Sequence, residues 1–127
     1  MTTDSTASAS ASATSSAIVA TDRPGRYGKQ LASHLGRRMV SSWDDDGGTG
    51  EVTFPFGRAE LTAREDGLHL FVAGSPDAEP DLQGAAGLDR LEDVVGRHLV
   101  RFGTKDELVV QWQRSDGTPG SRQELTE

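Results

Sequence analysis

Two histidines lie in stretches where apolar residues recur at helical spacing. His34 falls within residues 24–38, and His98 falls within residues 88–102. Neutral imidazole is a common metal ligand and changes its charge near neutral pH, so two histidines brought together could form a metal site or a proton relay. They could instead be core residues whose ring nitrogens bond carbonyl or carboxylate groups, as buried polar groups normally do.

We favour the structural role for both histidines. A metal site needs three or four ligands, and the chain has no H-E-x-x-H motif or comparable ligand spacing. We therefore expect His34 and His98 to be buried and free of metal, and we predict no other cofactor. The third histidine, His69, alternates away from the apolar face of its segment, which predicts a surface position.

Basic side chains gather on the outward faces of the same two helical stretches. The second stretch carries Arg90, Arg97 and Arg101, and the outer flank of the first carries Arg23, Arg26, Lys29 and Arg37. Of these, Arg26, Lys29, Arg97 and Arg101 form a candidate ligand-binding site. A guanidinium group offers a planar fork to a carboxylate or phosphate, so two such faces could bind a small anionic ligand or partner. The alternative is ordinary solvated helix faces with local ion pairs, such as Asp93 with Arg97 at i,i+4.

Motifs that would identify an enzyme are missing. The chain has no G-x-S-x-G nucleophile elbow, no motif of paired carboxylates and no cysteine. Residues 44–50 imitate part of a calcium loop, but an EF-hand would then need Ser42 and Thr53 as its first and last ligands. This segment is expected to be a hairpin turn. Catalysis is therefore unsupported, and a small enzyme with a site at His34 and His98 is kept as an alternative.

The overall composition excludes several classes of protein. The 127 residues carry a net charge of −7, which disfavours nucleic-acid binding because affinity for a polyanion comes from a basic surface. No run approaches the roughly 18 apolar residues of a membrane span, and no secretory signal is present at the N-terminus. We expect an acidic cytoplasmic protein without nucleic-acid or membrane partners.

The chain divides into one domain and two polar ends. Residues 1–16 are almost entirely Ser, Ala and Thr, and residues 115–127 are mostly Gly, Pro, Ser and charged side chains. Such segments bury too little apolar surface to offset the entropy lost on ordering, so both are predicted to be disordered. The domain is expected to cover residues 17–114.

Hydrophobic periodicity predicts an α+β fold for this domain. The expected helices cover residues 24–38 and 88–102. The expected strands cover residues 17–20, 39–43, 51–56, 59–63, 68–72 and 107–113. Pro55 cannot donate to a strand ladder, so its strand is either at an edge or broken there, and Asp66-Gly67 is a strong hairpin signal. The order β-α-β-β-β-β-α-β predicts a two-layer sandwich, in which an antiparallel sheet carries both helices on one face.

Three segments together resemble a small bacterial family. They are Tyr27–Leu35, Phe54–Gly57, and Glu92–Phe102 followed by Asp106–Trp112. The chain is similar there to the domain of unknown function DUF2218, which is common in actinobacteria, and the resemblance spans about Ile18 to Trp112. Members of that family are sometimes encoded beside, or joined to, siderophore-interacting flavin reductases. The resemblance thus implies an iron or siderophore context and such a reductase as a candidate partner.

The same resemblance marks candidate site positions. The matching histidines are His34 and His98, and the aromatic residues expected near them are Phe54, Phe56 and Trp112. Three functions follow as hypotheses. The first is a small binding or accessory module, the second is a small enzyme using the two histidines, and the third is a homodimeric domain that buries a sheet face.

Overall fold

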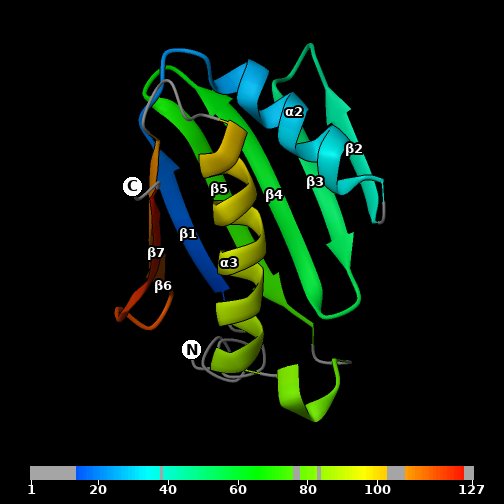
Figure 1. The fold of residues 1–127 in the computed structure, drawn as a ribbon, viewed down its shortest axis with the longest axis vertical. Coiled ribbons are helices and arrows are strands. Elements are labelled where there is room, and N and C mark those ends of the chain that lie inside the picture. The colour runs from blue at the N-terminus through cyan, green and yellow to red at the C-terminus, as the bar shows by residue number, and fades with distance from the viewer. Residues whose placement is uncertain (1–13, 38, 76–77, 83, 103–107, 125–127) are drawn as a thin grey trace, which may run out of the picture.

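One antiparallel sheet and two helices form the folded part of the chain (Figure 1). The computed structural model describes residues 14–37, 39–75, 78–82, 84–102 and 108–124. The strands are β1 (Thr14–Val19), β2 (Val40–Asp44), β3 (Thr49–Phe54), β4 (Gly57–Arg64), β5 (Gly67–Gly74), β6 (Val109–Arg114) and β7 (Pro119–Glu124). The helices are α2 (Pro24–Leu35) and α3 (Ala85–Phe102), with a 3-10 turn η1 at Pro80–Leu82.

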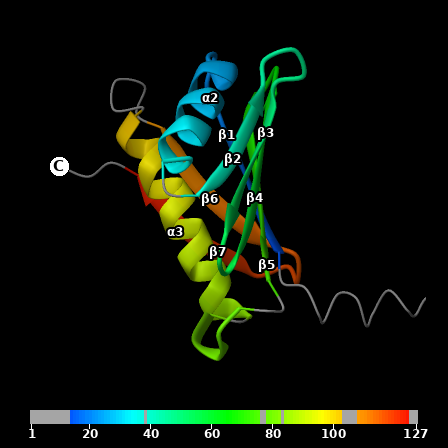
Figure 2. The same ribbon diagram turned by 90° about the vertical axis from the view of Figure 1, so that its right-hand side faces the viewer.

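The two helices cover one face of the sheet, as the sequence predicts (Figure 2). The seven strands follow the order β2-β3-β4-β5-β1-β6-β7, and each neighbouring pair is antiparallel. The hydrophobic core lies between these layers, where alternate strand residues meet the apolar stripes of the helices. The α+β two-layer architecture is therefore confirmed, with one strand more than expected.

Tight turns connect β3, β4 and β5. Phe54 pairs with Gly57, so Pro55 lies in a two-residue turn and ends its strand. Of the two alternatives for Pro55, the broken strand is correct, because β3 lies inside the sheet between β2 and β4. A hairpin is also present near Asp66-Gly67, but Arg64 pairs with Gly67, so its turn residues are Glu65 and Asp66, one residue earlier than predicted, and Gly67 begins β5.

Local chemistry starts and stops α2. Pro24 is at its first position, where the missing N–H is not needed. The Thr21 hydroxyl accepts a hydrogen bond from the Arg23 amide at 3.0 Å. The helix ends at Leu35, earlier than the expected residue 38, because Gly36 weakens its last turn. Its buried side is formed by Tyr27, Gly28, Leu31, Ala32 and Leu35.

A tryptophan fixes α2 against the edge of the sheet. A Cβ atom on Gly28 of α2 would lie 2.6 Å from Cη2 of Trp43, and one on Gly50 of β3 would lie 2.6 Å from Cε3 of the same ring. Both glycines therefore leave room for the Trp43 ring between helix and sheet. This close approach requires residues without side chains at these two positions.

The longer helix, α3, begins three residues before the predicted start at Leu88. Its predicted stripe is buried at Leu88, Leu91, Val95 and Leu99. The side chain of Phe102, the last predicted member, lies outside the described residues. Among the described residues, no helix combines the length and apolar character needed to cross a lipid bilayer.

The C-terminal segment corrects a prediction from composition. A disordered tail is expected over residues 115–127, but the structure places Pro119–Glu124 in β7, paired with β6. The N-terminal arm is expected over residues 1–16, but β1 begins at Thr14. Residues 1–13 lie outside the described part of the chain. The whole of β7 and the first residues of β1 are polar, so a prediction based on apolar content misses them.

Candidate functional site

The fold brings His34 and His98 together between the two helices. His34 lies in the last turn of α2, and His98 lies one turn before the end of α3. Their ring centroids are 5.0 Å apart and their planes are tilted by 44°. The structure corrects the expectation of burial, because both side chains are half-buried at the surface of a pocket.

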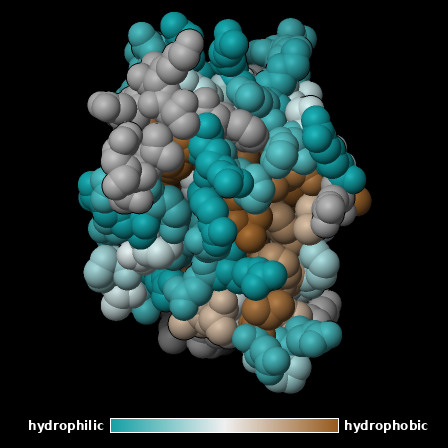
Figure 3. Space-filling model, in the orientation of Figure 1, coloured by the Kyte–Doolittle hydropathy of each residue, from teal (hydrophilic) through white to brown (hydrophobic). Residues whose placement is uncertain are grey.

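The pocket between the helices combines cationic and apolar groups. Its volume is about 480 Å³, within the range of about 300–1,000 Å³ that small-molecule sites usually occupy. His34, Arg37 and His98 supply nitrogen atoms. The rest of the lining is apolar and consists of Leu35, Met39, Phe54 and Val94. Figure 3 views the helical side of the molecule and shows hydrophobic surface gathered in the groove beside α3.

One hydrogen bond sets the tautomer of His98. Its Nδ1 lies 2.7 Å from the carbonyl oxygen of Val94, and a carbonyl can only accept, so Nδ1 carries a proton. In the neutral imidazole the lone pair is then on Nε2. This nitrogen can accept a proton, or donate a hydrogen bond once it is protonated.

The surroundings of His34 disfavour its charged form. Burial, then the nearby His98 and then Arg37, lower the pKa of His34 below its ordinary value. An anion in the pocket would reverse this effect, because a negative charge nearby stabilises imidazolium. Anion binding at this pocket would therefore be coupled to proton uptake by His34.

The comparisons with known proteins agree with the resemblance of the sequence. Residues 16–113 match the family described as an uncharacterized protein conserved in bacteria, DUF2218. The chain belongs to this family. The comparisons with curated proteins and with solved structures give no match. The matched region of this DUF2218 member contains every residue that lines the helical pocket.

The predicted aromatic residues separate into two places. Phe54 lines the pocket. The ring of Phe56 contacts the ring of Phe54, with the two centroids 5.4 Å apart. Trp112 is fully buried on β6, which β4, β5 and β1 separate from β3. Its indole N–H donates to Oε1 of Gln123 at 2.7 Å. Trp112 is therefore a core residue in this fold and does not line the pocket.

The predicted basic residues lie outside the pocket lining. Arg26, Lys29, Arg97 and Arg101 are all exposed. Lys29 forms an ion pair with Asp45 at 3.5 Å, and Arg97 pairs with Asp93 one helical turn away. Exposed pairs of this kind contribute little to stability, typically about 0–1 kcal/mol.

The sequence places Arg37 among the outer basic residues of the first helix and does not single it out as a site residue, whereas the structure places it in the pocket lining. The amide of Arg37 bonds the carbonyl of His34 at 3.3 Å, so a turn after α2 carries Arg37 to the side of the histidine. The spacing of three residues from His34 was the available signal, since residues i and i+3 share a helix face.

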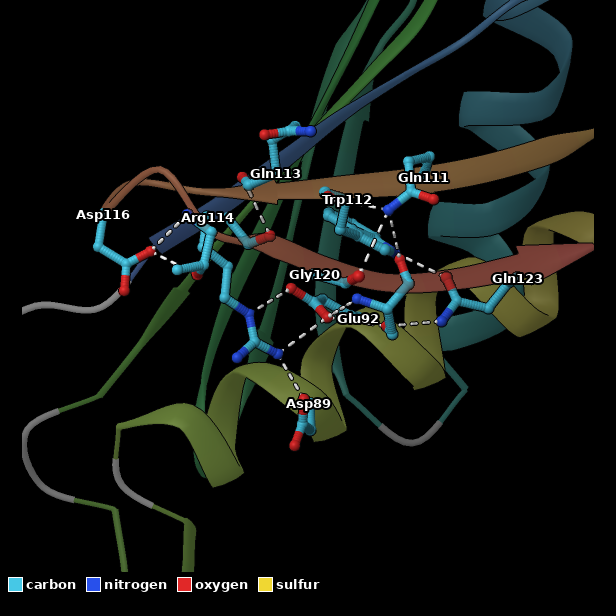
Figure 4. Close-up of polar contacts among 12 residues, drawn as sticks. Asp89, Glu92, Gln111, Trp112, Gln113, Arg114, Asp116, Gly120 and Gln123 are labelled. Carbon is cyan, nitrogen blue, oxygen red and sulfur yellow. Dashed lines mark hydrogen bonds and ion pairs between the residues drawn. The ribbon is translucent and has the colours of Figure 1, made fainter.

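A second polar cluster, also missed from the sequence, lies at the other side of α3 (Figure 4). Glu92 is fully buried, and its Oε2 accepts a hydrogen bond from Nε of Arg114 at 3.1 Å. Its Oε1 accepts from the amide and the hydroxyl of Ser121 at 2.9 and 2.8 Å. Arg114 also pairs with Asp89. This cluster ties β6 and β7 to α3.

The charges of this cluster are matched. Burial raises the pKa of Glu92, but the hydrogen bonds from Arg114 and Ser121 outweigh it and leave the pKa lower than usual. The pKa of Arg114 is raised, mainly by its hydrogen bond to Glu92. Every described group here has a partner, which is typical of a structural ion pair.

Within the described residues, no three or more His, Asp or Glu side chains are grouped as a metal site would require. The two histidines of the pocket could supply two metal ligands, one or two fewer than a metal site needs. The expectation that the histidines are metal-free stays a prediction.

The sheet face opposite the helices is largely polar. Ile18 of β1 is 57% exposed there, and Phe71 of β5 is half-buried beneath the guanidinium of Arg58 at 5.6 Å. Arg58 in turn pairs with Glu51 and Glu60. Antiparallel sheets commonly leave one face in water, so this surface agrees with a solvated sheet.

Proposed function

We propose that this protein is a small binding module that holds an anion in the pocket between α2 and α3. The observation that supports it most is the convergence of His34, Arg37 and His98 at one pocket. Arginine binds carboxylate and phosphate groups through two parallel hydrogen bonds, and imidazolium adds charge and donors. The exposed basic residues predicted from the sequence would at most attract anions to the pocket through their long-range electrostatic field.

Binding of an anion at this pocket should strengthen as the pH falls. His34 lies at the C-terminal end of α2, where the partial negative charge of the carbonyl groups favours a cation. Because burial, His98 and Arg37 disfavour protonation of His34, a bound anion would supply a counter-charge. We therefore expect tighter binding at pH 5.5 than at pH 7.5.

Acetate and inorganic phosphate test this proposal. Each is titrated to millimolar concentration while NMR records the imidazole shifts of His34 and His98. Saturable shifts are expected, and Arg37→Gln should abolish them. Arg64→Gln removes an exposed arginine at the end of β4 that does not line the pocket and should leave them unchanged. Unchanged titrations in Arg37→Gln would contradict anion binding at this site.

Acid–base catalysis is a second candidate, supported by the tautomer of His98. A histidine with Nδ1 bonded to a carbonyl presents Nε2 as a base, which is the arrangement that general-base catalysis needs. Hydrolysis of p-nitrophenyl acetate measures this directly. Activity above that of free imidazole, lost in His98→Asn and kept in His69→Asn, would favour the enzyme over the binding module.

The cellular context stays a proposal that rests on the resemblance to DUF2218. Iron or siderophore handling in the cytoplasm, with a siderophore-interacting flavin reductase as partner, is compatible with an anion site, because ferric chelates carry carboxylate or hydroxamate groups. A ferric hydroxamate therefore belongs among the compounds to be titrated. Co-purification with the reductase tests the partner.

A homodimer through the open sheet face is the third proposal. Ile18 and Val40 are the exposed large hydrophobic residues of the described chain. Both lie on this face, since Ile18 pairs with His69 and Val40 pairs with Thr53. Sedimentation equilibrium of the wild type and of Ile18→Lys measures any such association.

A further inference from the structure

We propose that the ligand of the helical pocket is an amphipathic monocarboxylate, a compound with one carboxylate and a hydrocarbon body. Its carboxylate binds Arg37 with the two histidines, and its hydrocarbon body lies on the apolar wall formed by Met39, Phe54 and Val94. This inference rests on the proposed anion-binding function and names the class of anion.

The wall is apolar, and two of its three residues are partly open to solvent, while Phe54 is buried behind them. Val94 lies one helical turn before His98, so the apolar surface of α3 continues directly from the histidine. Met39 and Val94 are half-buried, which means that part of each side chain faces the pocket instead of the core. A pocket that only had to hold phosphate would gain nothing from such a wall.

The wall also extends beyond the helix that bears the charges. In Figure 1, α2 crosses one end of β3 and β4, while the opposite ends of these strands run on past it. Phe54 lies at that end of β3, and Phe56 in the following turn adds a second ring at 5.4 Å. A ligand with its charged group near α2 would therefore extend its hydrocarbon body toward Phe54, which Phe56 supports from outside the pocket lining.

The charges of the pocket fit a single carboxylate. Arg37 is the lining side chain that is charged at every physiological pH, and the lowered pKa of His34 keeps that imidazole neutral at pH 7. Among the described lining residues, this one fixed positive charge balances one negative charge. A second negative charge would have to be neutralised by further protonation of the site.

A series of straight-chain acids from acetate to octanoate measures the role of the wall. Each methylene moved from water onto apolar surface should tighten binding roughly fourfold, until the chain outgrows the pocket. Isothermal titration calorimetry on the full chain at pH 6.5 gives the dissociation constants. Hexanamide has a similar hydrocarbon chain without charge and should bind at least tenfold more weakly than hexanoate.

Variants of the apolar wall and of Arg37 measure separately what the hydrocarbon body and the carboxylate contribute to affinity. The double variant Met39→Gln/Val94→Thr keeps side-chain size but makes the wall polar, so the gain per methylene should fall while acetate binding stays. The control Ile18→Thr/Val40→Thr makes a comparable change on the opposite face of the sheet and should alter neither. Arg37→Gln should weaken every acid of the series.

The outcomes distinguish this inference from the proposed function. Equal affinity for acetate, phosphate and octanoate, all lost in Arg37→Gln, would overturn the amphipathic ligand and leave the anion site intact. Octanoate and hexanamide binding alike, with no effect of Arg37→Gln, would overturn both. Binding of no acid at all would also overturn both.

Discussion

His34 is half-buried beside His98 and Arg37, and this environment should change its pKa measurably. We predict that its pKa lies below the ordinary value of about 6.5, because burial, His98 and Arg37 each disfavour its positive charge. His98→Asn removes one of these causes and should raise the pKa of His34. NMR titration of the imidazole protons tests this. A value at or above 6.5 in the wild type would mean that the ring is better hydrated than its position indicates.

The same shift predicts how stability depends on pH. A histidine whose folded pKa is below its unfolded pKa contributes stability that is fully present above the unfolded value of about 6.5. That contribution is lost as the pH falls toward the folded pKa, since the unfolded chain then binds more protons. Urea unfolding at pH 7.5 and 5.5 should show the loss in the wild type and a smaller loss in His34→Gln.

Glu92 is predicted to be the polar residue most sensitive to substitution. Glu92→Leu leaves Arg114 without its main partner, and breaking a buried ion pair typically costs about 3–5 kcal/mol. Leu at both positions removes the unpaired charge, so the double variant should regain part of the loss. Urea unfolding of the two single variants and the double variant measures the coupling. Equal losses in Glu92→Leu and in Glu51→Leu, which removes an exposed carboxylate paired with Arg58, would contradict the role of the cluster.

The elements of this fold were predictable where apolar residues recur. The stripe from Leu88 to Leu99 gave the phase of α3 because a helix places residues three and four apart on one face. The start of the helix was misplaced, since Ala85, Ala86 and Gly87 carry no such signal. Glu92 could not be assigned to the buried side, because its partners Arg114 and Ser121 come from strands much later in the chain.

Substitution by alanine should have opposite effects on stability at two glycines of α2. Gly25→Ala should stabilise the protein by up to about 1 kcal/mol, because nothing lies within 4 Å of the added Cβ and alanine favours helix. Gly28→Ala should destabilise it by about 1–3 kcal/mol, since its Cβ would lie 2.6 Å from Trp43. Thermal unfolding of the two variants is the measurement. Stabilisation by Gly28→Ala would show that the Trp43 ring can move aside.

At the scale of the whole molecule, the strand that composition could not reveal is β7. Its residues, Pro119–Glu124, include no large apolar side chain, so neither alternation nor hydrophobicity predicts it. Its inward contacts are polar instead, through Ser121 to Glu92 and Gln123 to Trp112. The pocket was predictable in part, because His34 and His98 were recognised. Arg37 was assigned only to the outer basic face of the first helix, since its place beside His34 depends on the turn after α2.

Removal of β7 should therefore be costly. A chain ending at Ser115 loses the Ser121 hydrogen bonds of buried Glu92 and the partner of the Trp112 indole. Each buried polar group left unsatisfied costs about 1–3 kcal/mol, so the truncated protein should lose several kcal/mol of stability. Circular dichroism during urea unfolding compares it with the full chain. An unchanged unfolding midpoint would instead support the prediction that residues 115–127 are disordered.

The position of β1 also determines the order in which this chain can fold. β1 leaves the ribosome first, yet it ends inside the sheet, between β5 and β6. Its pairing with β5 can form early, but the partner of Ser15 on β6 is Arg114, almost a whole domain length later. Until then one side of β1 offers unpaired backbone groups to neighbouring chains. Nascent chains stalled before β6 should therefore aggregate, and the contacts between distant strands should make refolding slow for a domain of this size.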